Sequence, residues 1–131
     1  MRLLLDSHSI LWFSDDSPKM PESIKRIIED KANEKFVSLA SVWELAIKFT
    51  TGKLKFTDPP ELYLADLLRL NHFQLFPLTF SHVVSGAALP YYHRDPFDRV
   101  IIAQSLLEEI PVVSADTVFD AYGVNRIWKS L

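Results

Sequence analysis

Short apolar runs alternate with stretches of helical periodicity along most of the chain. The run at residues 3–5 predicts a buried strand that ends at Asp6, and similar patterns predict strands at 36–39, 73–78, 111–114 and 124–128. Apolar residues at i, i+3 and i+4 spacing predict helices that begin near Pro21, Ser41, Pro60, Ser81 and Asp95. The helix that follows Asp95 is apolar on most of its sides, so we expect it to be buried.

This alternation predicts both a fold class and the position of a site. We expect a single α/β domain over residues 1–131, in which helices cover both faces of a central, mainly parallel sheet to give three layers. Pro77 suits an edge strand, because proline cannot donate a hydrogen bond within a sheet. Ligands of parallel sheets bind beyond the carboxyl ends of the strands. Asp6 and Asp116 each follow an apolar strand, so we expect both side chains at that end.

Composition and charge narrow the class of protein. With 131 residues, of which 48% are hydrophobic, the chain has a globular composition. Cysteine is absent, which excludes disulfides and thiolate chemistry and fits a cytoplasmic location. The net charge of −3 argues against binding nucleic acid by bulk electrostatics alone, unless cations neutralise the acids. Asp6 interrupts the apolar start, and no later run is long enough for a membrane span, so we expect a soluble protein.

Several acidic residues have both a structural and a chemical interpretation. Asp6 can cap the segment that begins at Ser7, and Asp116 can lie in a loop or cap a short helix. Glu44 fits a Ser-x-x-Glu capping box that begins at Ser41. The neighbours of Glu44 are mostly apolar, however, so a carboxylate buried there needs a partner or a metal.

The segment 95–99 is the densest acidic signal. Asp95 is placed to cap a helix, with Pro96 at the first helical position. Asp98 lies in the first turn, where the helix dipole favours an anion, and it begins the most apolar helix of the chain. We therefore expect Asp98 to face inward, with Arg99 as its neutralising neighbour or as a phosphate contact.

Four acids at one end of a parallel sheet would repel one another unless a proton or a cation neutralises them. Because oxygen ligands without cysteine suit hard cations, the pattern favours Mg²⁺, with Mn²⁺ also possible.

Four segments resemble, in order, the motifs of PIN-domain proteins, and among these the chain is most similar to the VapC-like toxins of type II toxin–antitoxin systems. The segments are LLLDSH at 3–8, SVWELAIK at 41–48, HRDPFDR at 93–99 and SAD at 114–116. The resemblance spans residues 3–128 and implies a PIN-like fold. It implies that the metal ligands and catalytic residues are Asp6, Glu44, Asp98 and Asp116. It also implies supporting roles for Asp95, Ser114 and Ser7, the last standing where threonine is frequent.

The resemblance further implies a reaction and partners. The protein is expected to be a Mg²⁺-dependent endoribonuclease toxin that cleaves RNA with metal-activated water and is bound by a cognate antitoxin. Candidate phosphate contacts, each of which could instead be a solvated surface charge, are Lys48, Lys53, Arg94 and Arg99. We also expect a homodimer or antitoxin face, because so small a core does not readily bury all of Trp12, Phe13, Phe49, Phe56 and Tyr63.

Two other functions are consistent with parts of the pattern. An aspartate-based phosphatase or phosphotransfer domain also has an aspartate after its first strand, but a phosphatase would have a second one at position 8, where this chain has His8. A non-catalytic PIN-like binding module would use the acids only as caps. His8 and His93 suggest acid–base catalysis. We set them aside, because isolated histidines near strand ends are more often structural and no Gly-x-Ser-x-Gly motif is present.

Overall fold

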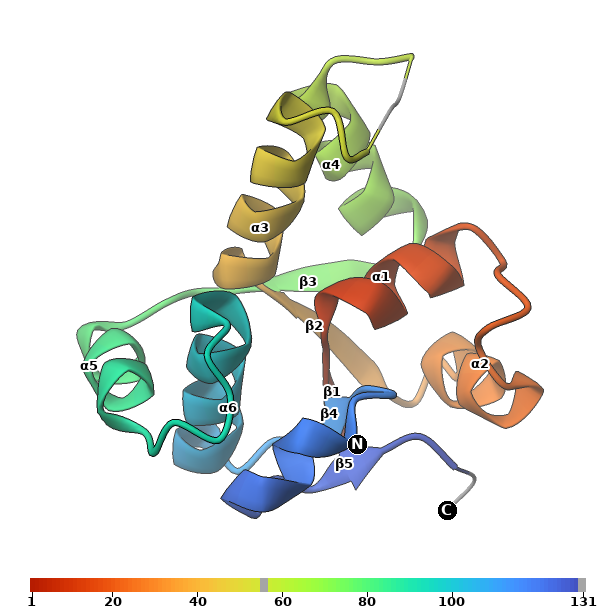
Figure 1. The fold of residues 1–131 in the computed structure, drawn as a ribbon. Coiled ribbons are helices and arrows are strands. Elements are labelled where there is room, and N and C mark those ends of the chain that lie inside the picture. The colour runs from red at the N-terminus through yellow and green to blue at the C-terminus, as the bar shows by residue number, and fades with distance from the viewer. Residues whose placement is uncertain (55–56, 130–131) are drawn as a thin grey trace.

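The computed structural model describes residues 1–54 and 57–129, and a five-stranded parallel sheet lies at its centre (Figure 1). The strand order is β3-β2-β1-β4-β5, which places β1 in the middle. The strands are β1 (Arg2–Leu5), β2 (Glu34–Ser38), β3 (Phe73–Phe76), β4 (Val112–Val113) and β5 (Arg126–Ile127). The predicted α/β class with a parallel sheet is confirmed. Strand β3 lies at an edge, as expected, but it ends at Phe76, before Pro77.

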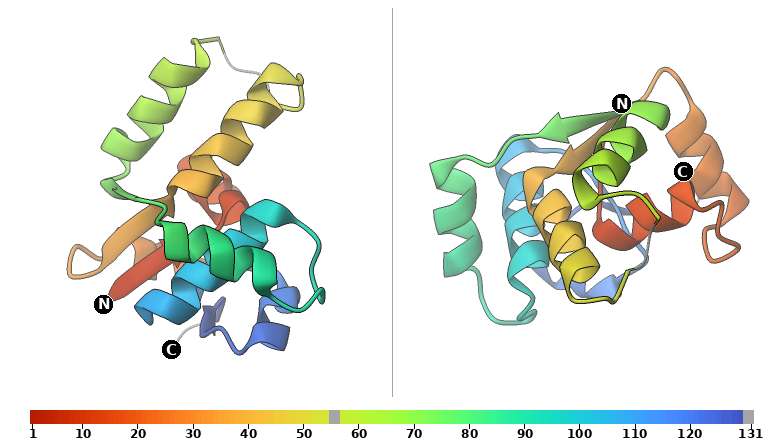
Figure 2. Two further views of the ribbon diagram at one scale, coloured as in Figure 1. Left: turned by 90° about the vertical axis from the view of Figure 1, so that its left-hand side faces the viewer. Right: turned by 90° about the horizontal axis from the view of Figure 1, so that it is seen from above.

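Six α-helices surround this sheet within the described residues (Figures 1 and 2). They are α1 (Ser7–Ser14), α2 (Glu22–Glu29), α3 (Leu39–Thr50), α4 (Pro60–Leu70), α5 (Phe80–Ala88) and α6 (Pro96–Glu108). A 3₁₀ helix, Thr117–Tyr122, precedes β5. Helices α1 and α2 cover one face of the sheet, and α6 covers the other with α5 packed outside it. Helices α3 and α4 pack side by side and extend away from the sheet (Figure 2).

The alternating side chains of β1 divide the core between the two faces. Leu3 and Leu5 pack with Ile10 of α1 and with residues of α2. Leu4 points the other way, toward Ile101 and Ile102 of α6. All of these side chains are fully buried, because the strand has helices on both faces. Buried on both faces, β1 has a fixed position in the sheet and provides a rigid base for the residue that follows it.

The order of the strands reverses at β1. The chain runs from β1 outward through β2 to β3 and then returns to place β4 on the other side of β1. The register pairs Leu5 with both Val37 and Val113, so these strands end at the same level. The carboxyl ends of β1 and β4 therefore flank a topological switch point, which is where ligands bind in sheets of this kind.

Two sequence predictions about individual segments are corrected. Helix α3 begins at Leu39 and is capped by Ser38, whose Oγ accepts a hydrogen bond from the Ala40 N–H. The capping box at Ser41 and Glu44 was therefore wrong, because both residues lie inside the helix. The final strand is also shorter than predicted and contains only two residues, Arg126 and Ile127.

Three of the five aromatic residues considered for an interface pack against the core. Trp12, Phe13 and Tyr63 are partly buried and pack against the core. Phe49 is half-buried, and Phe56 lies outside the described residues. The large aromatic side chains that are exposed are others, namely Trp43, Phe80, Tyr91 and Tyr92. Among the helices that the structure describes, none has both the length and the apolar character that crossing a membrane requires.

Candidate active site

Asp6 lies at the junction of β1 and α1 and serves both elements. Its Oδ1 accepts a hydrogen bond of 2.9 Å from the Ser9 N–H and caps α1. Its Oδ2 accepts a hydrogen bond of 2.5 Å from the Ser114 hydroxyl. The residue is only 4% exposed, and this burial raises the pKa of its carboxyl group, against the opposing effect of the hydrogen bonds. The capping interpretation of Asp6 is therefore correct, and it leaves one carboxylate oxygen facing the end of β4.

Ser114 connects Asp6 to Asp116. Its buried hydroxyl donates to Asp6 and accepts a hydrogen bond of 3.0 Å from the Asp116 N–H. Asp116 caps the 3₁₀ helix through the Val118 N–H at 3.0 Å, and its side chain remains exposed. A single serine at the end of β4 thus fixes the relative positions of two acidic residues that are far apart in the sequence.

Asp98 enters the same region from the first turn of α6. Asp95 caps this helix by accepting hydrogen bonds from the Phe97 and Asp98 N–H groups, as the sequence predicted. Burial raises the pKa of Asp98 to about 6, and the negative charges of Asp95 and Asp6 add to this rise. A hydrogen bond of 2.7 Å between Asp98 Oδ2 and His93 Nε2 acts in the opposite direction.

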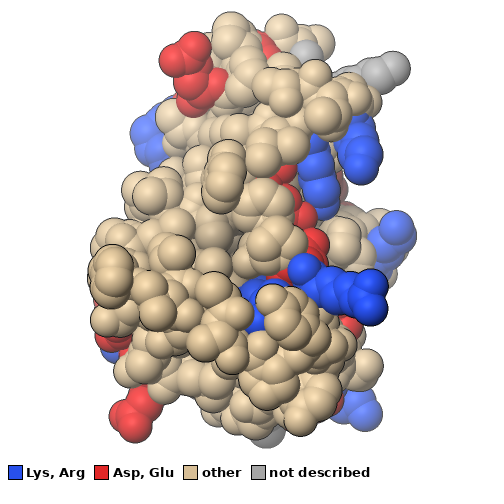
Figure 3. All heavy atoms as spheres, turned by 60° about the vertical axis from the view of Figure 1, so that its left-hand side comes forward, with Lys and Arg blue, Asp and Glu red and all other residues tan. Residues whose placement is uncertain are grey.

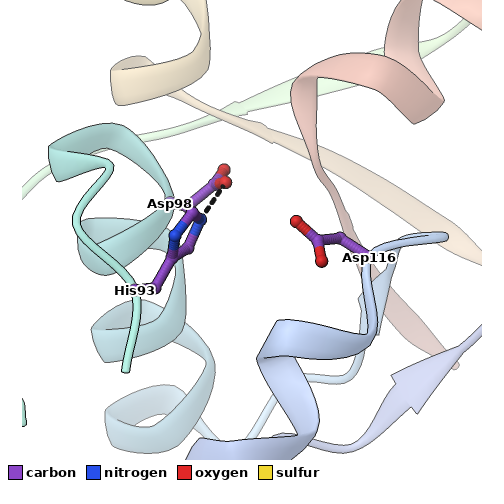
Figure 4. A group of neighbouring side chains, drawn as sticks. All are labelled: His93, Asp98 and Asp116. Atoms are coloured by element: carbon purple, nitrogen blue, oxygen red, sulfur yellow. Dashed lines mark hydrogen bonds and ion pairs between the residues drawn. The ribbon is translucent and has the colours of Figure 1, made fainter. Parts of the chain in front are cut away.

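His93, Asp98 and Asp116 form a compact group of possible metal ligands (Figure 4). One ligand atom from each of the three lies within 4.8 Å of the others. Asp6 is connected to this group through Ser114, whose hydroxyl donates to Asp6 and accepts from the Asp116 N–H. The sequence analysis had set His93 aside as a structural histidine. The feature that could have identified it as a site residue is its position five residues before Asp98, in the loop that leads into α6.

Glu44 joins the site indirectly. Its Oε1 accepts a hydrogen bond of 2.6 Å from the hydroxyl of Ser7, the residue after Asp6. Its Oε2 forms an ion pair of 3.0 Å with Lys48. Glu44 is only 9% exposed, and a buried carboxylate needs a partner. Ser7 and Lys48 are its partners. Among the described residues, it is not one of the side chains within 4.8 Å of one another, so Ser7 is its link to the other acids.

The four candidate phosphate contacts differ in availability. Arg94 and Lys53 are exposed, and Lys48 is paired with Glu44. Arg99 is 4% exposed, and its guanidinium donates to four backbone carbonyls, those of Ala87, Leu89, Pro90 and His93. Arg99 is therefore a structural residue, and we do not retain it as a phosphate contact. Figure 3 shows acidic side chains in a recess of the surface with Lys and Arg side chains at its edges.

The donor set of this site fits a divalent cation. Burial disfavours the ionised forms of Asp6 and Asp98 and raises the pKa of both carboxyl groups, and at Asp98 repulsion by the charges of Asp95 and Asp6 adds to this rise. A cation would offset both costs, and carboxylate oxygens with one imidazole nitrogen suit Mg²⁺ or Mn²⁺.

The model of the PIN domain family matches residues 3–125. No curated protein matches the chain. The solved structure of VapBC2 from Rickettsia felis bound to a DNA fragment from their promoter has a TM-score of 0.71 at 15% identity, with 99% of this chain and 98% of that chain covered. The solved structure of FitAcB from Neisseria gonorrhoeae has a TM-score of 0.64 at 20% identity, with 95% of this chain and 96% of that chain covered. The solved structure of FitAB bound to an IR36 DNA fragment has a TM-score of 0.61 at 18% identity, with 98% of this chain and 97% of that chain covered. Because the family model covers nearly the whole chain, the protein belongs to the PIN domain family.

Proposed function

We propose that this protein is a Mg²⁺-dependent endoribonuclease and the toxin of a toxin–antitoxin pair. The observation that carries the nuclease proposal is the convergence of Asp98 and Asp116 within 4.8 Å, beside the buried and electrostatically coupled Asp6. Acids so close together at the switch point of a sheet cost stability, and a metal-dependent reaction gives a reason for that cost. Membership of the PIN domain family supports a nuclease role.

Each residue of the site has a defined task in this proposal. Asp6, Glu44, Asp98 and Asp116 hold one or two cations, and Ser7 and Ser114 orient the carboxylates of Glu44 and Asp6. When bound, such a cation supplies an activated water and stabilises the charge that develops on the phosphate. Asp95 fixes the first turn of α6 and thereby the position of Asp98. Arg94 and Lys53, which are exposed, and Lys48, which pairs with Glu44, contact the RNA backbone.

The substitution Asp6→Asn tests this proposal. Asparagine also caps helices, so α1 should remain intact while a ligand charge is lost. We expect RNA cleavage in Mg²⁺ to fall by about a hundredfold or more. The matched control is Asp66→Asn, which removes a surface carboxylate paired with Arg69 on α4 and should leave cleavage unchanged. Full activity of Asp6→Asn, with an unchanged circular dichroism spectrum, would contradict the metal site.

An antitoxin is the proposed protein partner, as in the VapBC and FitAB assemblies that share this fold. A groove of about 420 Å³ lies between α3 and α4, and its lining is mainly apolar, with Leu39, Val42, Ala46, Leu64 and Leu68 among its residues. Such a groove suits the apolar face of an amphipathic helix.

Self-association is a second proposed interaction. Trp43, Phe80, Tyr91 and Tyr92 are all more than 60% exposed, which is unusual for large aromatic side chains. We expect light scattering to report a homodimer at high protein concentration and Phe80→Ser to weaken it. A wild-type monomer at every concentration would contradict this proposal.

A further inference from the structure

We propose that His93 is a nitrogen ligand of the cation bound at this site, and this inference rests on the proposed metal-dependent function. The carboxylates alone suit a hard cation. The structure adds an imidazole nitrogen to them, because one ring nitrogen of His93 lies in the same group of atoms within 4.8 Å as the carboxylates of Asp98 and Asp116 (Figure 4). The Nε2 atom of this ring is hydrogen-bonded to Asp98.

The distances are close to those of a shared coordination sphere. Around an octahedral ion with ligands at about 2.1 Å, neighbouring ligand atoms lie about 3 Å apart and opposite ones about 4.2 Å apart. The separation of 2.7 Å between His93 Nε2 and Asp98 Oδ2 is near the first value. The limit of 4.8 Å for the whole group exceeds the second by about half an ångström, a movement that side-chain rotation supplies. Coordination would replace the hydrogen bond between His93 and Asp98 by two bonds to the same ion.

The backbone of His93 is held in place at both of its polar groups. Its N–H donates to the hydroxyl of Tyr122 at 2.8 Å, and its carbonyl accepts from Arg99 at 3.0 Å. The Tyr122 hydroxyl in turn donates to the Pro90 carbonyl at 2.6 Å. The Arg99 guanidinium also lies 4.2 Å from the centre of the Tyr91 ring. The loop before α6 is thus ordered by contacts that use none of the proposed ligand atoms, which is the preorganisation that a metal site requires.

An imidazole ligand changes which metals the site prefers. Mg²⁺ favours oxygen ligands, whereas Mn²⁺ and later transition metals also accept nitrogen and bind such sites more tightly along the divalent series. The oxygen donors near His93 keep the site usable by Mg²⁺. We therefore infer that Mn²⁺ binds more tightly than Mg²⁺ and that His93 is the source of the difference.

Pulsed electron paramagnetic resonance of the Mn²⁺-loaded protein tests the inference directly. We expect couplings to a histidine nitrogen in the wild-type spectrum, their loss in His93→Gln and their retention in His8→Gln. His8 is the matched control, because it is an exposed histidine two residues after Asp6 that lies outside the ligand group. Selective ¹⁵N labelling of histidine in the wild-type protein identifies the signal without any substitution, so a variant that fails to fold does not prevent the test.

Calorimetric titration provides the second measurement. In His93→Gln we expect the affinity for Mn²⁺ to fall by about tenfold or more and that for Mg²⁺ to fall less, so that the ratio of the two decreases. Bound Mn²⁺ without nitrogen couplings, couplings lost in His8→Gln, or an unchanged ratio would overturn the role of His93 while the nuclease proposal stood. A wild-type protein that binds no Mn²⁺ and cleaves no RNA would overturn both.

Discussion

An aspartate at the start of a helix has two carboxylate oxygens and needs only one of them for capping. Asp6 and Asp116 each give one oxygen to a helix N-terminus. The second oxygen of Asp6 meets Ser114, and the carboxylate of Asp116 lies near that of Asp98. The capping interpretation and the metal interpretation of these residues are therefore compatible. The caps fix the backbone from which each carboxylate is presented to the site.

Asp98 contributes a pH dependence to the stability of the fold. Burial raises its pKa from 3.8 to about 6 in the folded protein, so the folded state holds this proton more tightly than the unfolded state. The resulting stability is fully present below about pH 4 and is lost as the pH rises through about 6. Asp98→Asn removes the titration, and we expect it to make the metal-free protein more stable by about 2 kcal/mol at neutral pH.

Urea unfolding in EDTA at several pH values measures this difference. The advantage of Asp98→Asn should shrink as the pH is lowered through about 6 and disappear near pH 4. A difference that does not change with pH, or a variant less stable than the wild type at neutral pH, would show that Asp98 is not held in this environment.

Arg99 is the residue whose role changes most between sequence and structure. Its four backbone acceptors hold the loop between α5 and α6, and they would lose a buried cationic donor in Arg99→Ala. We expect a loss of about 3 kcal/mol in the free energy of unfolding. The control Arg69→Ala removes an exposed ion pair with Asp66 and should cost less than about 1 kcal/mol. Equal effects of the two substitutions would contradict a structural role for Arg99.

At the scale of elements, the sequence predicted what depends on local pattern. Periodicity located α2 to α6, and Asp95 with Pro96 marked the start of α6 correctly, whereas α1 was not predicted as a helix. The start of α3 was misplaced because Ser38 and Ser41 are both suitable caps, and only the end of β2 decides between them. The place of His93 depends on Tyr122, which is 29 residues away, and no periodicity carries that contact.

Helices α5 and α6 approach each other closely at Gly86. A Cβ atom at this position would lie 3.2 Å from the Cα of Val100 and 3.3 Å from the carbonyl oxygen of Arg99. We expect Gly86→Val to destabilise the protein by about 1–3 kcal/mol, because backbone atoms of α6 must move. Ala88→Val, at an exposed position of the same helix, is the control and should have a smaller effect in thermal unfolding. A neutral Gly86→Val would mean that the two helices separate easily.

At the scale of the whole molecule, the order of the strands assembles the site. Asp6 follows β1, and Asp116 lies shortly after β4. The two strands are neighbours because Leu5 pairs with Val113, which is 108 positions further along the chain. The alternating pattern predicted the parallel sheet and hence this end of it as the site. It could not predict which aromatic side chains are exposed, because Trp12 and Tyr63 are covered by contacts between distant elements.

The central claim is that the acidic group binds a cation and thereby cleaves RNA. The most direct measurement is RNA cleavage by the wild-type protein and by Asp98→Asn, each in Mg²⁺ and in EDTA. The account predicts cleavage only by the wild type in Mg²⁺, with weak RNA binding in EDTA, because the uncompensated acids repel phosphate. Equal cleavage by the wild type in EDTA, or full activity of a folded Asp98→Asn in Mg²⁺, would contradict it.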